Sequence, residues 1–429
     1  MSELLEKDKA YVWHPFTQMK TEGSPIPMVK GEGTLLFDEN GKSYIDCNSS
    51  WWVNTHGHGH PYIKNALLDQ FDKLDHTLLA GVTHPKAAEL SERIVKLLGG
   101  DFQKVFFSDN GSTSTEVALK MSFQYWYNLE QPKHRVLAIE GAYHGDTFGA
   151  MSVGERDFFN RPFEPFFFHV DFLAFPTQEK EIEQLKKAEK LFKTNEFACL
   201  ILEPLVQGSS GMRMYSVSFL DQLVALAKKY KVLVIFDEVM TGWGRTGKMF
   251  AKDFLENQPD IICLSKGLTA GALAMGLTVT SQKIFDVFYA DDRAKALLHG
   301  HSYTGNPLTC AVACANLDLF ENPEVNKTLM WLEKEHNSFK QRLEKDNKVQ
   351  EIRIRGTIMA LELNTGEGNN YFSKLRNKAY QYFIDNGMLL RPLGNVIFLN
   401  PPYCITKEEL HYCYATIERF VKEESIIDV

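Results

Sequence analysis

Polar side chains that directly follow three apolar runs, in three residue pairs, are the part of this sequence best suited to chemistry. The pairs are Glu203-Pro204, Asp237-Glu238 and Ser265-Lys266. Uninterrupted apolar runs such as VLVIF and ACLIL are typical of strands covered by helices on both faces. In an open α/β sheet, ligands bind at the carboxyl ends of the strands. Because a buried acid or lysine is costly without a partner, we expect these groups to compensate one another or to meet a ligand.

A lysine and a carboxylate at such an edge are the groups that pyridoxal phosphate uses. Lys266 would form an imine with the cofactor's aldehyde, and Asp237 would hold a proton on the pyridine nitrogen. Exclusion of water beside a cationic ring would lower the pKa of Lys266, and the freed amine can take a Cα proton. An ordinary solvated strand end explains any one of these residues taken alone.

The stretch SDNGSTSTE offers donors for a phosphate between a predicted strand and a predicted helix. Gly111 and Ser112 would place backbone N–H groups and a hydroxyl at the helix N-terminus, where the helix dipole favours an anion. Thr113 and Glu116 also match a T-x-x-E capping box, so an ordinary helix start is the alternative.

The loop GAYHGDTFGA, which follows the predicted strand RVLAIE, offers the aromatic Tyr143 together with the titratable side chains of His144 and Asp146. An aromatic side chain at a strand end can cover a flat cofactor ring. Most loop residues of these types have no catalytic role, so the alternative is a structural loop.

Two other patterns indicate different functions. Residues 242–247 read G-x-G-x-x-G after a strand, which is typical of a nicotinamide-dependent oxidoreductase. The acidic pair 237–238 would occupy the pyrophosphate position, and no clear helix follows, so the context argues against it. His56, His58 and His60 have a spacing that can bind a metal, but the intervening glycines and the following proline favour a tight turn. We expect no metal site.

Composition limits the possible partners. The 429 residues, 44% of them hydrophobic, are enough for two lobes of a globular protein. A net charge of -8 predicts no broad attraction to nucleic acid or anionic lipid. The start MSELLEKDKA lacks the pattern of a secretory signal, and no run of about 18 apolar residues follows, so we expect a cytoplasmic protein that acts on small molecules. Seven scattered cysteines indicate reduced thiols. Cys310 and Cys314 are expected to lie on one buried face of a helix, where they pack as small residues.

From about residue 100, short β-rich runs alternate with helical stretches, which predicts a doubly wound, mostly parallel α/β sheet. We expect residues 61–325 to form this large domain and residues 326–429 to form a smaller α+β domain. The small domain would contain a long helix over 328–345, a strand over 353–363, a helix near 371–386 and strands around MLLRPL and NVIFLNPP. Residues 1–60 show no strong helix and are expected to pack with the small domain.

Two stretches, FDEVMTGWGRTG and PDIICLSKGLTAG, resemble the signature of the class III aminotransferases of fold type I. The resemblance extends over nearly the whole chain, through WHPFTQM, SSWWVNTHGHGHP, FFSDNGSTSTEVALKMSFQYW, AYHGDTFGAMSVG, EPLVQGSSGMRMY, HGHSYTGNPLTCAVACANL and LLRPLGNVIFLNPPY. It implies a pyridoxal-phosphate enzyme that is a homodimer with shared active sites.

Residue roles follow from the resemblance. Lys266 would carry the cofactor, Asp237 would face its pyridine nitrogen, and Tyr143 would stack on its ring. The other implied cofactor contacts are Gly111, Ser112, His301 and Ser302, with Ser302 reaching the phosphate of a neighbouring subunit. The implied substrate contacts are Phe16, Trp51, Tyr143, Lys266, Gly300 and Arg391, and the fork of Arg391 suits a carboxylate.

The stretches are most similar to family members of biotin biosynthesis, which convert 8-amino-7-oxononanoate to 7,8-diaminononanoate with S-adenosylmethionine as amino donor. Such members are expected to have tyrosine, proline and tyrosine where this chain has Phe16, His301 and Phe398. Two missing hydroxyls would alter donor recognition, so lysine as donor, or another ω-aminotransferase activity, stays an alternative. Ser209 replaces the glutamate of the Q-G-E sequence in the glutamate-dependent members, which argues against those.

Overall fold

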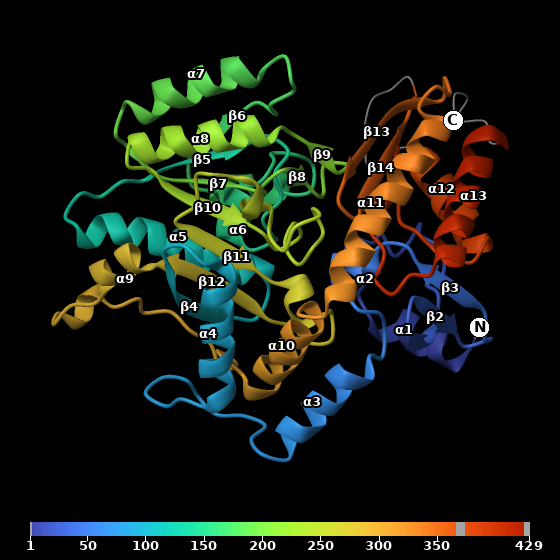
Figure 1. Ribbon diagram of the computed structural model, residues 1–429, viewed down its shortest axis with the longest axis horizontal. Helices are drawn as coiled ribbons and strands as arrows, with labels where there is room; N and C mark the ends of the chain where they lie inside the picture. Colours follow the sequence, from blue (N-terminus) through green and yellow to red (C-terminus); the bar gives the residue numbers. More distant parts are fainter. Residues whose placement is uncertain (1, 366–373, 424–429) are drawn as a thin grey trace.

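The computed structural model describes residues 2–365 and 374–423, and within them the largest sheet has seven strands in the order β4-β12-β11-β10-β7-β5-β6 (Figure 1). Neighbouring strands are parallel except at β12, which is antiparallel to both β11 and β4. The strands are β4 (Phe102–Ser108), β5 (Arg135–Ile139), β6 (Val170–Leu173), β7 (Phe197–Leu202), β10 (Leu233–Asp237), β11 (Ile261–Leu264) and β12 (Gly276–Ser281). The predicted α/β class with a large, mostly parallel sheet is confirmed.

Side chains of the central strands alternate between two hydrophobic cores. In β10, Leu233 and Ile235 pack with helix α5 on one face, while Val234 and Phe236 pack in the core that includes α8 on the other. This period of two follows from strand geometry, and both faces are apolar because helices cover both. The helices of this region are α3 (Pro61–Phe71), α4 (Pro85–Leu98), α5 (Gly111–Asn128), α6 (Phe148–Ser152), α7 (Glu181–Phe192), α8 (Val217–Lys229), α9 (Gln282–Phe288) and α10 (Pro307–Phe320).

The C-terminal region forms a second, smaller unit, drawn in orange and red in Figure 1. Its antiparallel sheet has the order β13-β14-β16, and the N-terminal strands form another sheet in which β15 lies parallel to β3. Chain segments more than 300 residues apart therefore share one sheet. The elements are β13 (Val349–Arg355), β14 (Ile358–Leu363), β15 (Met388–Leu389), β16 (Val396–Leu399), β1 (Met28–Glu32), β2 (Leu35–Asp38), β3 (Ser43–Asp46), α11 (Pro323–Leu343), α12 (Lys374–Asp385) and α13 (Lys407–Glu423). Residues 371–373 of the helix predicted near 371–386 lie outside the described residues.

Two sequence-based expectations about these elements were wrong. The strand expected over 353–363 is a hairpin of β13 and β14, which turns at Gly356 with φ +55°. The turn has no Asn-Gly or Asp-Gly signal, so the apolar alternation continues through it unmarked. The N-terminal stretch does contain a helix, α1 (Glu3–Tyr11), capped by Ser2. Since α1 buries no side chain, hydrophobic periodicity cannot reveal it.

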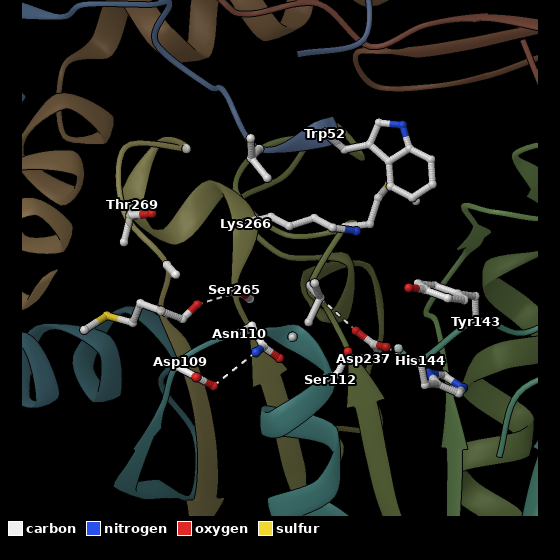
Figure 2. Close-up of a pocket in the computed structure, with 18 of the residues that line it drawn as sticks. Trp52, Asp109, Asn110, Ser112, Tyr143, His144, Asp237, Ser265, Lys266 and Thr269 are labelled. Atoms are coloured by element: carbon white, nitrogen blue, oxygen red, sulfur yellow. Dashed lines mark hydrogen bonds and ion pairs between the residues drawn. The ribbon is translucent and has the colours of Figure 1, made fainter. Parts of the chain in front are cut away.

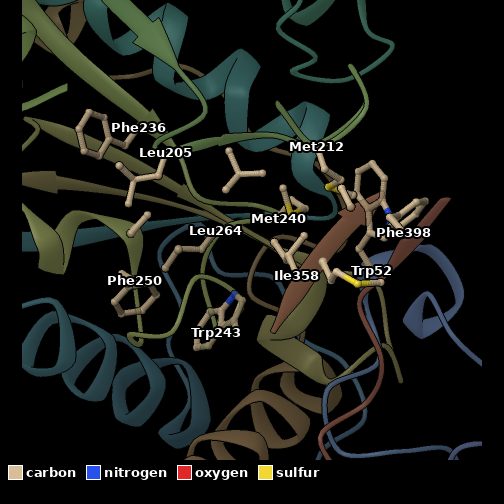
Figure 3. Close-up of a cluster of buried hydrophobic side chains, with 14 of the residues drawn as sticks. Trp52, Leu205, Met212, Phe236, Met240, Trp243, Phe250, Leu264, Ile358 and Phe398 are labelled. Carbon is tan, nitrogen blue, oxygen red and sulfur yellow. The ribbon is translucent and has the colours of Figure 1, made fainter. Parts of the chain in front are cut away.

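The two units meet in a continuous hydrophobic core (Figure 3). The ring of Phe398 on β16 lies 6.1 Å from that of Trp52, which belongs to the short helix α2 (Ser49–Trp52). Cys310 and Cys314 are buried on α10, so the predicted packing role is confirmed. In the described part of the chain, no helix is long and apolar enough to cross a bilayer.

Candidate active site

The carboxyl ends of β4, β5, β7, β10 and β11 surround a cavity of about 330 Å³. The three strand-end pairs predicted to meet do so here, since Glu203, Asp237 and Lys266 all line the cavity. Figure 2 shows Lys266 extending into it, with Trp52 on one side and Asp237 on the other. Parallel strands bring these residues together because their carboxyl ends share one sheet edge.

Lys266 is the first residue of the 3-10 helix η3 (Lys266–Thr269), and its φ of +47° is unusual for a residue with a side chain. Burial lowers its pKa to about 8, although Asp237 and Glu203 favour the charged form. Its Nζ lies 4.5 Å from the centroid of the Trp52 ring. The amine is therefore partly neutral near physiological pH, as a nucleophile or general base requires.

Asp237 is buried and holds two partners. Its Oδ2 lies 2.8 Å from Nδ1 of His144, and its Oδ1 accepts the backbone N–H of Val239 at 3.0 Å. A carboxylate has about four acceptor positions, so Asp237 can still accept another hydrogen bond from a group in the cavity. Nε2 of His144 is buried and has no hydrogen-bond partner among the described residues.

Helix α5 begins beside Lys266 at Gly111, and Gly111 and Ser112 both line the cavity. The helix does begin with a capping box, as the alternative interpretation required, but not with the T-x-x-E pair Thr113 and Glu116. Asn110 is the N-cap and forms the capping box with Thr113. The backbone N–H of Thr113 donates to Oδ1 of Asn110 at 2.9 Å. Glu116 instead accepts the backbone N–H groups of Gly149 and Ala150 at the start of α6.

The loop with Tyr143 packs closely against this helix. A Cβ atom at Gly145 (φ +122°) would collide with Oγ of Ser112, which also accepts the N–H of Asp146 at 3.2 Å. The Tyr143 hydroxyl donates to Asp146 at 2.9 Å, and burial raises the pKa of Tyr143 strongly. The aromatic side chain is thus held over the cavity by its own loop.

A second cavity, of about 190 Å³, adjoins the first and shares Trp52, Tyr143, His144 and Gly145 with it. The predicted substrate residues Phe16, Trp51 and Arg391 line this cavity, as does Phe398. The guanidinium carbon of Arg391 lies 5.5 Å from the Trp51 ring centroid, and the Phe16 ring lies 5.6 Å from the same ring. The cavity therefore combines aromatic walls with one basic group.

The alternative motifs have structural roles. Residues 242–247 form consecutive turns, and the buried Arg245 donates to the carbonyls of Pro401 and Asn54 at 2.8 and 2.9 Å. Glu238, the neighbour of Asp237, accepts the N–H groups of Ala251 and Lys252 and lines neither cavity. A dinucleotide site is therefore not formed by this G-x-G-x-x-G sequence.

The three N-terminal histidines face different neighbours. Nε2 of His58 lies 2.9 Å from Oδ2 of Asp46, whereas the His56 ring packs 4.7 Å from that of Phe320. His60 immediately precedes α3, as the predicted turn into a helix requires. Within residues 2–365 and 374–423, no group of three or more His, Cys, Asp or Glu side chains could hold a metal ion.

Gly300, His301 and Ser302 lie outside the residues that line the two cavities of this chain. They belong to the segment between η4 (Arg293–Lys295) and α10. Nε2 of His301 is buried and has no hydrogen-bond partner among the described residues. One chain therefore does not bring these predicted site residues to Lys266.

The comparison with protein families decides what the strand-end site belongs to. Residues 17–421 match the family described as Aminotransferase class-III. The chain belongs to this family. The chain is thus an aminotransferase, an enzyme of the class that the sequence predicted.

Individual relatives agree with this assignment. The chain is 45% identical to adenosylmethionine-8-amino-7-oxononanoate aminotransferase of Synechococcus elongatus, over 96% of this chain and 99% of the relative. A crystal structure of the aminotransferase of that name from Methanocaldococcus jannaschii matches with a TM-score of 0.93 and 35% identity over 99% of both chains. An omega transaminase from Pseudomonas jessenii in complex with PMP matches with a TM-score of 0.91 and 26% identity over 97% of both chains.

Three features of this aminotransferase site did not follow from sequence reasoning. His144 was singled out without a role, yet it is the side-chain partner of Asp237. Trp52, beside the predicted Trp51, is the residue that lies over the Lys266 amine. Glu203 contacts the backbone of two loops. Glu203 and His144 were visible as a strand-end acid and a loop histidine, and the doubled tryptophan of SSWWV was the signal for Trp52.

Proposed function

We propose that this aminotransferase binds pyridoxal phosphate and transfers an amino group to 8-amino-7-oxononanoate, which yields 7,8-diaminononanoate in biotin biosynthesis. The observation that carries the proposal is the pairing, in one buried cavity, of Lys266 with Asp237. The names of the related enzymes indicate the acceptor, and S-adenosylmethionine as the donor.

The residues present fit the cofactor. Lys266 would bind the cofactor, and Asp237 would accept a hydrogen bond from its protonated ring nitrogen. His144 would hold the Asp237 carboxylate in place. Gly111 and Ser112 would hold the phosphate at the start of α5, where close packing against Gly145 leaves no room for a Cβ atom. When bound, the cofactor supplies an electron sink for the reacting carbon.

The chain's own groups would then handle binding and proton transfer. Lys266 Nζ, with a pKa of about 8, would take the proton from the substrate carbon that bears the amino group. Tyr143 and Trp52 cover the cavity and exclude water, which strengthens the electrostatic interactions inside. Arg391 in the second cavity would bind the carboxylate of the acceptor, since its guanidinium can form two parallel hydrogen bonds.

The identity of the amino donor is a separate part of the proposal. The relatives' names favour S-adenosylmethionine, and the aromatic walls formed by Phe16 and Trp51 suit a flat, cationic donor. Lysine is the second candidate, because Phe16 and Phe398 lack the hydroxyls expected for adenosylmethionine recognition.

We also propose a homodimer in which Gly300, His301 and Ser302 complete the partner's site. Their position outside the cavities of their own chain supports this. Ser302 would reach the phosphate and Gly300 the substrate. The cytoplasmic location stays a prediction from sequence.

A two-stage experiment tests the proposal. The purified protein should absorb visible light, and borohydride followed by peptide mapping should attach the cofactor to Lys266, whereas Lys266→Ala should give no such adduct. In single-turnover reactions, the visible band should bleach with S-adenosylmethionine and return with 8-amino-7-oxononanoate. A colourless protein that binds no pyridoxal phosphate would overturn the cofactor assignment. Bleaching by lysine alone would change the donor, and no recovery with the acceptor would reject the biotin assignment.

A further inference from the structure

Glu203 connects two separate segments of the site. It directly follows β7, and its side chain is 5% exposed. Oε1 accepts the backbone N–H of Tyr143 at 3.0 Å, and Oε2 accepts the backbone N–H of Gly208 at 2.9 Å. Each oxygen of one carboxylate therefore holds a different loop.

Both loops carry residues that line the second cavity. Tyr143 lines both cavities, and Ser209, which directly follows Gly208, lines the second. A bond to a backbone N–H fixes the peptide itself, so it constrains the side chain attached there more tightly than contact between side chains does. The separation between these two walls thus depends on one buried carboxylate.

We propose that Glu203 is a positioning residue, which sets the width of the substrate cavity by holding the Tyr143 loop and the Gly208–Ser209 segment through two backbone hydrogen bonds. This inference rests on the proposed function, because it takes the second cavity to be the place where substrates bind. Glu203 itself lines the first cavity. Its effect on the second cavity passes through Tyr143 and Ser209.

The chain contains a matched control in Glu238. Its side chain is also buried at a strand end, after β10, and it accepts two backbone N–H groups, from Ala251 and Lys252, both at 2.8 Å. Burial raises the pKa of both carboxyls to about 7. Glu238 lines neither cavity. Its replacement therefore removes the same type of interaction without releasing a cavity wall.

The experiment compares the wild-type holoenzyme with Glu203→Gln and Glu238→Gln. A glutamine places an NH2 group against one of the two N–H donors, so one loop is released. In hydrogen-exchange mass spectrometry without substrate, peptides with Tyr143 or Gly208 should exchange about tenfold faster in Glu203→Gln. In Glu238→Gln the change should be confined to the peptide with Ala251 and Lys252.

Kinetics give the second readout. Glu203→Gln should raise the KM of both substrates about tenfold and change kcat less than about threefold, because a displaced wall weakens ground-state and transition-state binding alike. Glu238→Gln should leave KM within about twofold. Unchanged exchange and KM in Glu203→Gln would overturn the proposal, and so would an equal rise of KM in both variants, since that would indicate general loss of stability.

Glu203→Asp provides the same test if the glutamine variant does not fold. The shorter side chain keeps the charge but reaches one of the two N–H groups, so the released loop should show faster exchange and KM should again rise. Aspartate behaviour identical to the wild type would contradict the proposal. Failure of the proposed function is distinguishable, because a wrong substrate assignment removes turnover in the wild type while the exchange results stay the same.

Discussion

Nδ1 of His144 lies 2.8 Å from Oδ2 of Asp237, and both side chains are buried in the wall of the first cavity, which contains Lys266. The two residues are 93 positions apart in the chain, on the loop after β5 and at the end of β10. A buried carboxylate needs such a partner to stay charged and oriented. In the proposed enzyme, the pair would orient Asp237 toward the ring nitrogen of the cofactor.

Replacement of this carboxylate should impair catalysis far more than stability. Asp237→Asn should lower kcat at least about a hundredfold, because an amide does not neutralise a cationic ring nitrogen. His144→Phe should lower it about tenfold, because Asp237 then loses one hydrogen bond. Steady-state kinetics and cofactor retention during gel filtration measure both effects. Asp260→Asn is the control, since Asp260 accepts the N–H of Val234 outside the cavities. A wild-type kcat in Asp237→Asn would contradict the assigned role.

Arg391 should determine the affinity for the acceptor's carboxylate. Arg391→Lys should raise the acceptor KM about tenfold, because an ammonium cannot form the two parallel bonds of a guanidinium. The donor half-reaction provides an internal comparison in the same variant. A methyl ester of the acceptor should bind wild type and variant with similar KM. If acid and ester respond equally to the substitution, Arg391 does not contact the carboxylate.

The phenylalanines of the second cavity should govern donor choice. Phe16→Tyr and Phe398→Tyr each restore one hydroxyl, which should shift the kcat/KM ratio of S-adenosylmethionine over lysine by up to about tenfold. Phe16 is 44% exposed, so its variant should keep the wild-type Tm, whereas Phe398, 2% exposed, needs a partner for the new hydroxyl. Rates of bleaching by each donor measure the ratio. An unchanged ratio in the double variant would exclude both residues from donor selection.

A mixing experiment tests the shared site. Lys266→Ala and Ser302→Asp homodimers should both be inactive, but a random mixture of their subunits should recover about a quarter of wild-type activity, because half of the dimers then contain one intact site. Lys266→Ala mixed with Asp237→Asn should recover nothing, since both defects lie in the chain's own cavity. No recovery in the first mixture, after confirmed subunit exchange, would mean that Ser302 does not serve the partner's site.

Acid should destabilise the smaller, C-terminal unit because its buried His336 must stay neutral. Burial lowers the pKa of this histidine from 6.5 to about 4, and the ring lies between the Tyr414 hydroxyl (2.7 Å) and the Thr357 carbonyl (3.1 Å). The unfolded chain binds a proton below pH 6.5 and the folded chain does not, so stability falls from pH 6.5 toward pH 4. At pH 5, this difference in proton binding lowers the free energy of unfolding by roughly 2 kcal/mol.

Urea unfolding at pH 7.5 and pH 5 measures this effect. His336→Gln should show a smaller loss of unfolding free energy between the two pH values than the wild type. His56, whose pKa burial also lowers to about 4, accounts for part of the remaining loss. His134→Gln is the control, because His134 is an exposed histidine on the surface. Equal pH dependence in the wild type and His336→Gln would contradict the prediction.

The sequence by itself determined the fold class and predicted which strand ends would meet. Apolar runs alternating with helical stretches predict a mostly parallel sheet, and parallel strands collect Lys266, Asp237 and Glu203 at one edge. Family resemblance then named Phe16, Trp51 and Arg391, which the structure brings together in the second cavity. These conclusions depend on local periodicity and on residue type, both of which are readable along the chain.

Only the tertiary structure decided which side chains serve the site. Asp237 faces the cavity while its neighbour Glu238 binds the backbone of η2 (Ala251–Phe254), because successive residues of a strand point to opposite faces. His144 and Trp52 come to the site from a loop and from the N-terminal region, through contacts between segments distant in sequence. Such pairings depend on the packing of whole elements, and no local pattern of residues encodes them.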